Sequence, residues 1–169
     1  MGPIGRHVAG PPVFAAKLKT PFAVLGIRIC GSALTGVEYL PLSERAMAPT
    51  NTLAERVCRQ IERFLDDPLF RFTLPMAPAG TAFRRRVWDA LPAIPVGESR
   101  TYGEMARQLG SAPRAIGGAC AANPIGLIIP CHRVVGSRGA LGGFMGVTEG
   151  KPIDIKRWLL SHEGYRFGR

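Results

Sequence analysis

The sequence predicts an α+β protein, in which a small N-terminal antiparallel sheet with a helix is followed by a mostly helical C-terminal domain. Three short apolar stretches, separated by proline and glycine, occupy residues 13–40. After residue 52, apolar residues recur at helical spacing behind residues that cap helices. Of the 169 residues 46% are hydrophobic, which is ample material for a packed core.

The N-terminal sheet is predicted from stretches rich in β-branched and aromatic residues. Thr20-Pro21 interrupts the first pair of stretches, and Gly31 and Gly36 punctuate the second. Such short, closely connected strands pair as neighbours, which favours an antiparallel arrangement. The three strands are expected at residues 13–18, 22–29 and 34–40.

One helix follows the sheet and closes the first unit. Residues 52–55 match a capping box, in which threonine and glutamate each cap the other's backbone. Cys58 shares the apolar stripe of this helix and is expected in the core. Three prolines between residues 66 and 80 end the unit, so we predict a supporting domain of residues 1–78 and a second domain of residues 79–169. The stripe consists of Leu53, Val57, Ile61 and Leu65.

The second domain begins with three helices. Thr81 caps the first, and residues 101–104 form a capping box that begins a short helix ending at Gly110. Ser111 and Pro113 open the next helix, which makes a helix-turn-helix with the one before it. The buried stripe of the first helix is expected to be Phe83, Val87, Trp88 and Leu91.

The helix predicted at residues 113–122 has an unusual surface. At about 100° per residue, Ile116 and Cys120 lie on one side, so Cys120 is expected in the core and unreactive. The opposite side carries Arg114, Gly118, Ala121 and Ala122, so it is nearly bare of long side chains. Solvated helix faces normally carry long charged side chains, so this bare face suggests that a partner approaches the helix backbone closely. A helix buried on both sides is the alternative.

The most reactive segment follows the apolar run at residues 125–129, which is expected to be a buried strand. It places Cys131, His132 and Arg133 together at the end of that run. A cysteine becomes a strong nucleophile as a thiolate, and a neighbouring histidine or cation lowers its pKa. A small buried residue followed by a surface dipeptide is the ordinary alternative.

Charge and composition narrow the function classes. The net charge is +10, and residues 81–169 hold thirteen basic but only six acidic groups, which favours a polyanionic partner such as nucleic acid over a merely solvated basic face.

No apolar stretch approaches the roughly 18 residues of a membrane span, and no secretory pattern begins the chain, so we expect a cytoplasmic protein without membrane contact. The four cysteines show no C-x-x-C spacing, which predicts free thiols and no metal site.

Several motifs of the second half occur in the order and spacing of one known family. They are Pro130-Cys131-His132-Arg133-Val134, Gly80-Thr81-Ala82-Phe83, Val87-Trp88, Thr101-Tyr102-Gly103-Glu104, Arg114-Ala115-Ile116-Gly117-Gly118-Ala119, Asn123-Pro124 and Trp158-Leu159-Leu160-Ser161-His162-Glu163-Gly164. Through these residues the chain resembles the O6-alkylguanine-DNA alkyltransferases, also called methylated-DNA-protein-cysteine methyltransferases. The resemblance covers about residues 80 to 165, and the N-terminal part fits it only loosely.

The resemblance implies a DNA repair protein that takes the alkyl group from O6 of guanine onto its own cysteine, irreversibly and once per molecule. Cys131 would be the acceptor, and Glu163 would orient His132, which deprotonates the thiol through water. Neighbours on an extended segment point to opposite sides, so we expect no direct contact between His132 and the Cys131 sulfur. The transfer in this family uses no metal and no cofactor.

The resemblance also implies how DNA is bound. The helix at residues 113–122 would lie in the minor groove, Arg114 would fill the gap left by a flipped guanine, and Tyr102 would contact guanine N3. The partner would be double-stranded DNA containing O6-alkylguanine, bound by a monomer. The other implied site residues are Thr101, Ala115, Gly118 and Ala122 for DNA, Asn123 for tying this helix to the active-site segment, and Val134, Phe144 and Met145 for the base pocket.

Two local features bear on this interpretation. Where many members of the family have a tyrosine and a small residue, this chain has Phe144 and Met145, followed by an apparent insertion at residues 147–152, so the alkyl groups accepted are expected to differ. Glu163 lies at the end of a helix, where the helix dipole disfavours negative charge. Rules of this kind tend to be broken at functional sites, and a solvated Glu163 is the alternative. His162 continues an apolar stripe and is expected to be structural.

The sequence leaves three other functions open. An alkyltransferase-like protein would bind alkylated DNA and recruit repair factors without reacting, but members of that group lack the acceptor cysteine. A Cys-His hydrolase would need an oxyanion site, which the sequence does not indicate. A structural helix-turn-helix protein would read sequence in the major groove, for which the bare helix face is unsuited.

Overall fold

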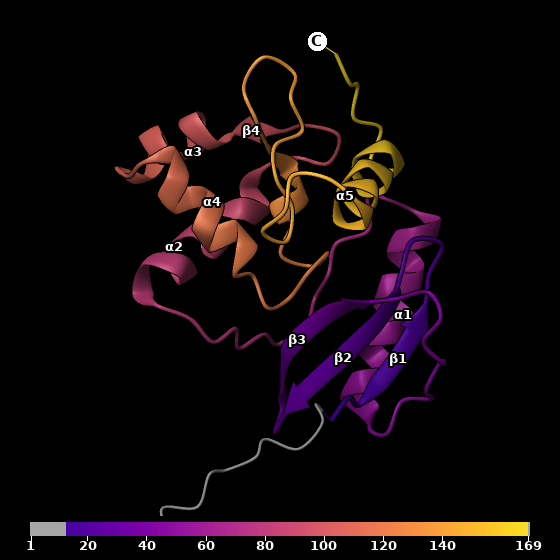
Figure 1. The fold of residues 1–169 in the computed structure, drawn as a ribbon. Helices are drawn as coiled ribbons and strands as arrows, with labels where there is room; N and C mark the ends of the chain where they lie inside the picture. Colours follow the sequence, from indigo (N-terminus) through magenta and orange to yellow (C-terminus); the bar gives the residue numbers. More distant parts are fainter. Residues whose placement is uncertain (1–12, 169) are drawn as a thin grey trace, which may run out of the picture.

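The computed structural model describes residues 13–168, and the predicted α+β fold is confirmed (Figure 1). A three-stranded antiparallel sheet in the order β1-β2-β3 comes first, with β2 in the centre. Its strands are β1 (Ala16–Lys19), β2 (Val24–Cys30) and β3 (Ala33–Leu40). The sequence features noted in residues 1–12, including the missing secretory pattern, lie outside the described residues.

The helix α1 (Thr52–Asp66) packs against the sheet through its predicted stripe. Val57 and Ile61 are fully buried, and Cys58 lies in the core as expected. The predicted cap is off by one residue: Asn51 is the N-cap, because its side chain accepts a hydrogen bond of 2.8 Å from the Ala54 N–H. Asparagine is a stronger cap than threonine, so Thr52 becomes the first helical residue.

The second half of the chain is mostly helical, as predicted. Thr81 caps the first of these helices. Thr101 and Glu104 form the predicted capping box of a second helix, and Gly110 ends that helix with a φ of 64°. That left-handed backbone favours glycine. The elements are α2 (Ala82–Ala90), the 3-10 helix η1 (Leu91–Ala93), β4 (Arg100–Thr101), α3 (Tyr102–Leu109), α4 (Pro113–Ala121), the 3-10 helix η2 (Cys131–Arg133), β5 (Val134–Val135) and α5 (Lys151–His162).

The apolar run at residues 125–129 is not a strand, so that prediction was wrong. Only Ile125 makes a β-bridge, to Val37 of β3, and the chain then turns with Leu127 at a φ of 68°. Asn123 closes this turn: its side chain accepts from the Ile125 N–H and donates to the Ile129 carbonyl. A short apolar run has no periodicity that separates a buried strand from a buried loop.

The cysteine motif follows directly as η2 rather than as extended chain. β5 then pairs in parallel with β4, which brings the end of the motif beside the start of α3. The motif therefore lies between the α3–α4 pair on one side and α5 on the other (Figure 1).

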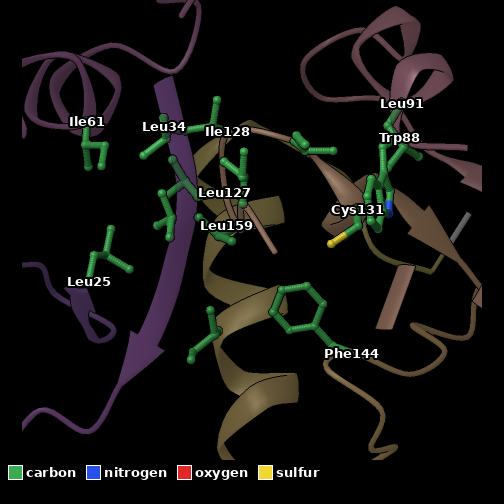
Figure 2. Packing of buried hydrophobic residues seen from close by; sticks show 14 of the residues in the cluster. Leu25, Leu34, Ile61, Trp88, Leu91, Leu127, Ile128, Cys131, Phe144 and Leu159 are labelled. Carbon is green, nitrogen blue, oxygen red and sulfur yellow. The ribbon is translucent and has the colours of Figure 1, made fainter. Parts of the chain in front are cut away.

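One hydrophobic core runs through both halves of the chain (Figure 2). It holds residues of the sheet, such as Leu25 and Leu34, together with Trp88 of α2, whose indole N–H donates to the Ala119 carbonyl of α4 at 2.8 Å. His162 joins the halves, because its ring nitrogen Nε2 bonds the Phe64 carbonyl at 2.7 Å, which agrees with the expected structural role. The division near residue 78 stays a prediction.

Within residues 13–168, none of the helices has the length and apolar character that crossing a membrane requires.

Candidate active site

Cys131 lies at the wall of a cavity in the second half of the molecule. Its side chain is buried, and its Sγ accepts a hydrogen bond of 3.2 Å from Nδ2 of Asn123. Burial raises the pKa of the Cys131 thiol, while the Asn123 hydrogen bond and the charge of Lys156 act in the opposite direction. Asn123 thus both shapes the turn before the cysteine and stabilises a thiolate at it.

Behind the cysteine, His132 forms a buried pair with Glu163. His132 Nε2 lies 2.8 Å from Glu163 Oε1, and both side chains are almost inaccessible to solvent. Glu163 is the C-cap of α5, which brings its carboxylate from 31 residues further along the chain to this position. The alternative of a solvated Glu163 is therefore excluded.

Arg133 completes this group, a role that the sequence did not reveal. Its Nε and a terminal nitrogen donate to the two oxygens of Glu163 at 3.0 and 2.9 Å, and its other terminal nitrogen donates to the Ile94 carbonyl at 2.8 Å. Burial raises the pKa of Glu163, but the hydrogen bonds and charges of His132 and Arg133 lower it to about 2. The carboxylate is consequently ionised throughout the physiological range.

These contacts determine the proton positions on the imidazole. Burial lowers the pKa of His132, and although the hydrogen bond that it donates to Glu163 opposes this, the pKa stays below its ordinary value and the ring is neutral at pH 7. An ionised carboxylate can only accept, so His132 Nε2 carries the proton and Nδ1 presents a lone pair. Nδ1 is buried and has no hydrogen-bond partner among the described residues. The geometry therefore provides a base one residue from Cys131 that makes no direct hydrogen bond to the sulfur.

The pH dependence of thiol alkylation follows from these directions. We expect the rate of Cys131 alkylation by iodoacetamide to keep increasing with pH up to at least pH 9, which is the ordinary pKa of a cysteine thiol. The reason is that burial keeps the thiol protonated in the neutral range. Peptide mass spectrometry after timed quenching measures the rate at each pH. A plateau reached already at pH 7 would contradict this, because it would mean that the free protein holds a stable thiolate.

Lys156 is a second functional residue that sequence reasoning missed. It projects from α5 and is fully buried, and its Nζ donates to the Val134 carbonyl at 2.6 Å and to the Gly143 carbonyl at 2.9 Å. Burial lowers the pKa of Lys156 to about 8. The Tyr102 hydroxyl donates to the same Gly143 carbonyl at 3.1 Å. Lys156 and Tyr102 therefore anchor the start of the loop that holds Phe144 and Met145.

The cavity beside Cys131 has a volume of about 400 Å³. Phe144 is buried and Met145 is 41% exposed, and both line the cavity. Val134 is fully buried and is not among the lining residues, and its carbonyl accepts from Lys156, so its expected contact with the base stays a prediction. Burial raises the pKa of Tyr102 well above its ordinary value, so its hydroxyl stays protonated. The lining comprises Tyr102, Pro113, Arg114, Gly117, Cys120, Ala121, Cys131 and Gly143 to Thr148.

Cys120 lies at the edge of the core rather than within it, which corrects the prediction from the helical wheel. It is half-buried and lines the cavity, on the face of α4 that also holds Gly117 and Pro113, positions three and seven residues earlier. The helix is turned so that Ile116 and Ala119, rather than Cys120, point into the core. Burial raises the pKa of Cys120 to about 12, so its thiol stays protonated at neutral pH.

The side of α4 that faces solvent is open, as the composition suggested. Arg114, Ala115 and Gly118 are exposed, and a side chain built at Gly118 would meet no atom within 4 Å. The alternative of a helix buried on both sides is therefore excluded. Ala122 is half-buried at the C-cap of α4, and the Thr101 hydroxyl is engaged in capping α3, so their contacts with DNA stay predictions. In the described part of the chain, no group of histidine, cysteine and acidic residues could hold a metal ion.

Sequence comparisons connect these residues with known proteins. A family model described as "6-O-methylguanine DNA methyltransferase, DNA binding domain" matches residues 82–165. A methylated-DNA–protein-cysteine methyltransferase of Salmonella typhimurium is 50% identical over 95 residues, which is 55% of this chain and 53% of that relative. The protein of the same name from Mycobacterium bovis is 37% identical over 158 residues, 88% of this chain and 91% of that relative. This chain therefore spans about half of the first relative and nearly all of the second.

The fold is also similar to a solved structure. The crystal structure of Mycobacterium tuberculosis OGT in complex with DNA has a TM-score of 0.74 at 36% identity, over 88% of this chain and 91% of that chain. With this coverage, the similarity includes the N-terminal sheet as well as the helices around Cys131.

Proposed function

Because this chain belongs to the O6-methylguanine DNA methyltransferase family, we propose that it repairs double-stranded DNA by taking the alkyl group of an O6-alkylguanine onto Cys131. The observation that carries the proposal is the position of the Cys131 thiol, at the wall of a cavity with the buried His132–Glu163 pair behind it. A nucleophile backed by an oriented base is the arrangement that covalent group transfer requires.

The proposed reaction is an in-line displacement at carbon. The Cys131 proton passes through a water molecule to His132 Nδ1, and the thiolate attacks the alkyl carbon. The sulfur–carbon bond forms while the bond from carbon to O6 breaks, and its electron pair stays on the base. The proton taken from the thiol then passes to the guanine, which thereby becomes unmodified. Cys131 is left as a thioether, which has no ionisable proton, so each molecule reacts once.

The base must leave the stack before this can happen, because the O6 substituent of a paired guanine cannot reach a buried thiol in line. We propose that α4 enters the minor groove, where Ala115 and Gly118 allow the helix backbone to approach closely. The exposed Arg114 would fill the gap left by the flipped guanine, and Tyr102 would contact guanine N3. The +10 net charge would contribute a favourable, salt-dependent term to binding.

The rival functions fit these residues less well. A non-reacting alkyltransferase-like protein needs no thiol, yet this chain has Cys131 with a base behind it. A Cys-His hydrolase needs its base in direct contact with the nucleophile, whereas the sulfur here receives its hydrogen bond from Asn123. We further propose that the protein acts as a monomer in the cytoplasm and needs no cofactor.

The direct test is the mass of the cysteine peptide. After incubation with a duplex that contains one O6-methylguanine, we expect the peptide containing Cys131 to gain the mass of one methyl group in place of a proton. The DNA should lose the lesion in equal amount. An unmodified peptide alongside intact lesions would refute alkyl transfer and leave the non-reacting alternative.

Arg114 allows a separate test of base flipping. We expect Arg114→Ala to slow transfer from duplex DNA about tenfold, because unstacking a base costs a few kcal/mol and the arginine would offset part of this cost. Transfer from free O6-methylguanine base should be almost unchanged, since no stack has to be opened. Single-turnover rates with both substrates give the comparison, with the exposed Arg107→Ala as the matched control. Equal losses on the two substrates would mean that Arg114 does not support flipping.

A further inference from the structure

A second cavity reaches Cys131 from the side of the N-terminal sheet. It has a volume of about 480 Å³ and lies between β3 and the segment at residues 120–126. It shares part of its wall with the cavity beside α4, namely Cys120, Ala121, Cys131, Phe144 and Met145. In Figure 2 the Cys131 sulfur points away from Trp88, toward the side on which β3 and Phe144 lie. The sulfur is therefore placed where the two cavities meet.

Tyr39 of β3 forms part of the wall of this second cavity. Its ring centroid is 5.8 Å from that of Phe144, and it packs over Gly126, where a Cβ atom would come within 2.6 Å of the ring. Glycine at position 126 is thus what allows the tyrosine to lie there. A residue of the N-terminal sheet, outside the segment matched by the family model, thereby reaches the active site.

The Tyr39 hydroxyl is buried and finds no hydrogen-bond partner of good geometry among the described residues. Burial raises the pKa of Tyr39, and the charge of a Cys131 thiolate raises it further, while the nearby Leu127 N–H opposes both. The hydroxyl therefore keeps its proton and has no acceptor for it among residues 13–168. A buried donor without an acceptor costs free energy unless a ligand supplies one.

The geometry of the displacement directs part of the substrate toward this hydroxyl. In the proposed reaction sulfur, carbon and O6 lie in line, and the guanine would occupy the cavity beside α4. Atoms of the alkyl group beyond the reacting carbon project to the side of this line. The second cavity, which begins at Cys131, is the space available to them.

Resting on the proposed function, we propose that Tyr39 is a specificity-determining residue whose hydroxyl donates a hydrogen bond to a neutral oxygen on the alkyl group. The favoured substrates are then O6-alkylguanines of the 2-hydroxyethyl type, over apolar groups of the same size. A neutral rather than an anionic group is indicated, because Arg28, the basic residue in this wall, is already paired with Glu38 at 2.6 Å.

The test compares duplexes that contain O6-(2-hydroxyethyl)guanine, O6-propylguanine or O6-methylguanine. The first two groups have nearly the same size and differ in one hydroxyl. We expect Tyr39→Phe to lower the ratio of the hydroxyethyl rate to the propyl rate about three- to tenfold, which is the effect of losing one hydrogen bond. Any change in thiol ionisation affects both substrates equally and cancels in this ratio.

The matched control is Tyr165→Phe, which removes a hydroxyl from a tyrosine that packs on Phe167 instead. The control should leave the ratio unchanged. An unchanged ratio in Tyr39→Phe, with methyl transfer intact, would overturn the role of Tyr39. Absence of methyl transfer from the unaltered protein would overturn the proposed function instead, so the two failures are distinguishable.

Discussion

Cys131→Ser should abolish alkyl transfer, with a loss of more than about a thousandfold in the single-turnover rate. Serine has almost the same size as cysteine and can keep the contact with Asn123, so the protein should stay folded. Its hydroxyl ionises far less readily than a thiol and is a much weaker nucleophile at neutral pH. The measurement is the disappearance of O6-methylguanine from a labelled duplex, together with the mass of the peptide that contains position 131.

The controls for this variant use the other two shielded cysteines. Cys58→Ala and Cys120→Ala should keep transfer, because burial raises the pKa of these thiols to about 11 and about 12. Cys131→Ser should still bind duplex DNA, since the exposed face of α4 is unaltered. Transfer by Cys131→Ser at a rate near that of the unaltered protein would show that another cysteine is the acceptor.

Glu163→Gln should have the second largest effect, on both rate and stability. Without the carboxylate, no negative charge holds the His132 proton on Nε2, and the guanidinium of Arg133, whose side chain is only 11% exposed, loses its counter-ion. We expect transfer to slow by about 10²- to 10⁴-fold, the usual contribution of an oriented acid–base group. The free energy of unfolding should fall by about 3–5 kcal/mol, as when one partner of a buried ion pair is removed.

The pH dependence of stability gives an independent measurement on the same variant. The pKa of Glu163 is about 2 in the folded protein and 4.5 ordinarily, so its contribution is complete above about pH 4.5 and is lost as the pH falls toward 2. Urea unfolding across that range should show a weaker pH dependence for Glu163→Gln than for the unaltered protein. The exposed Glu62→Gln on α1 is the matched control. Parallel curves for Glu163→Gln and the unaltered protein would contradict the contacts described for this carboxylate.

Most of the helices could be predicted because their signals are local. Thr81, Thr101 and Gly110 cap helices through atoms within a few residues of themselves, and the apolar stripes identify the faces that are buried. Two of the errors arose where local signals competed. Asn51 displaced Thr52 as a cap, and Asn123 folded residues 125–129 into a turn that their composition alone did not indicate.

By itself, the sequence determined the α+β class, the adjacent cysteine and histidine of the candidate site, and the bare face of the helix beside them, because motifs within a few residues specify each of these. Only the tertiary structure decided which distant groups surround the sulfur. It placed Glu163 on His132, Lys156 beneath the loop at residue 143, and Tyr39 beside the cavity. Contacts of this kind join residues that lie 13 to 31 positions apart, or in separate halves of the chain. They form because the core packs helices and sheet in one particular arrangement, which no local pattern records.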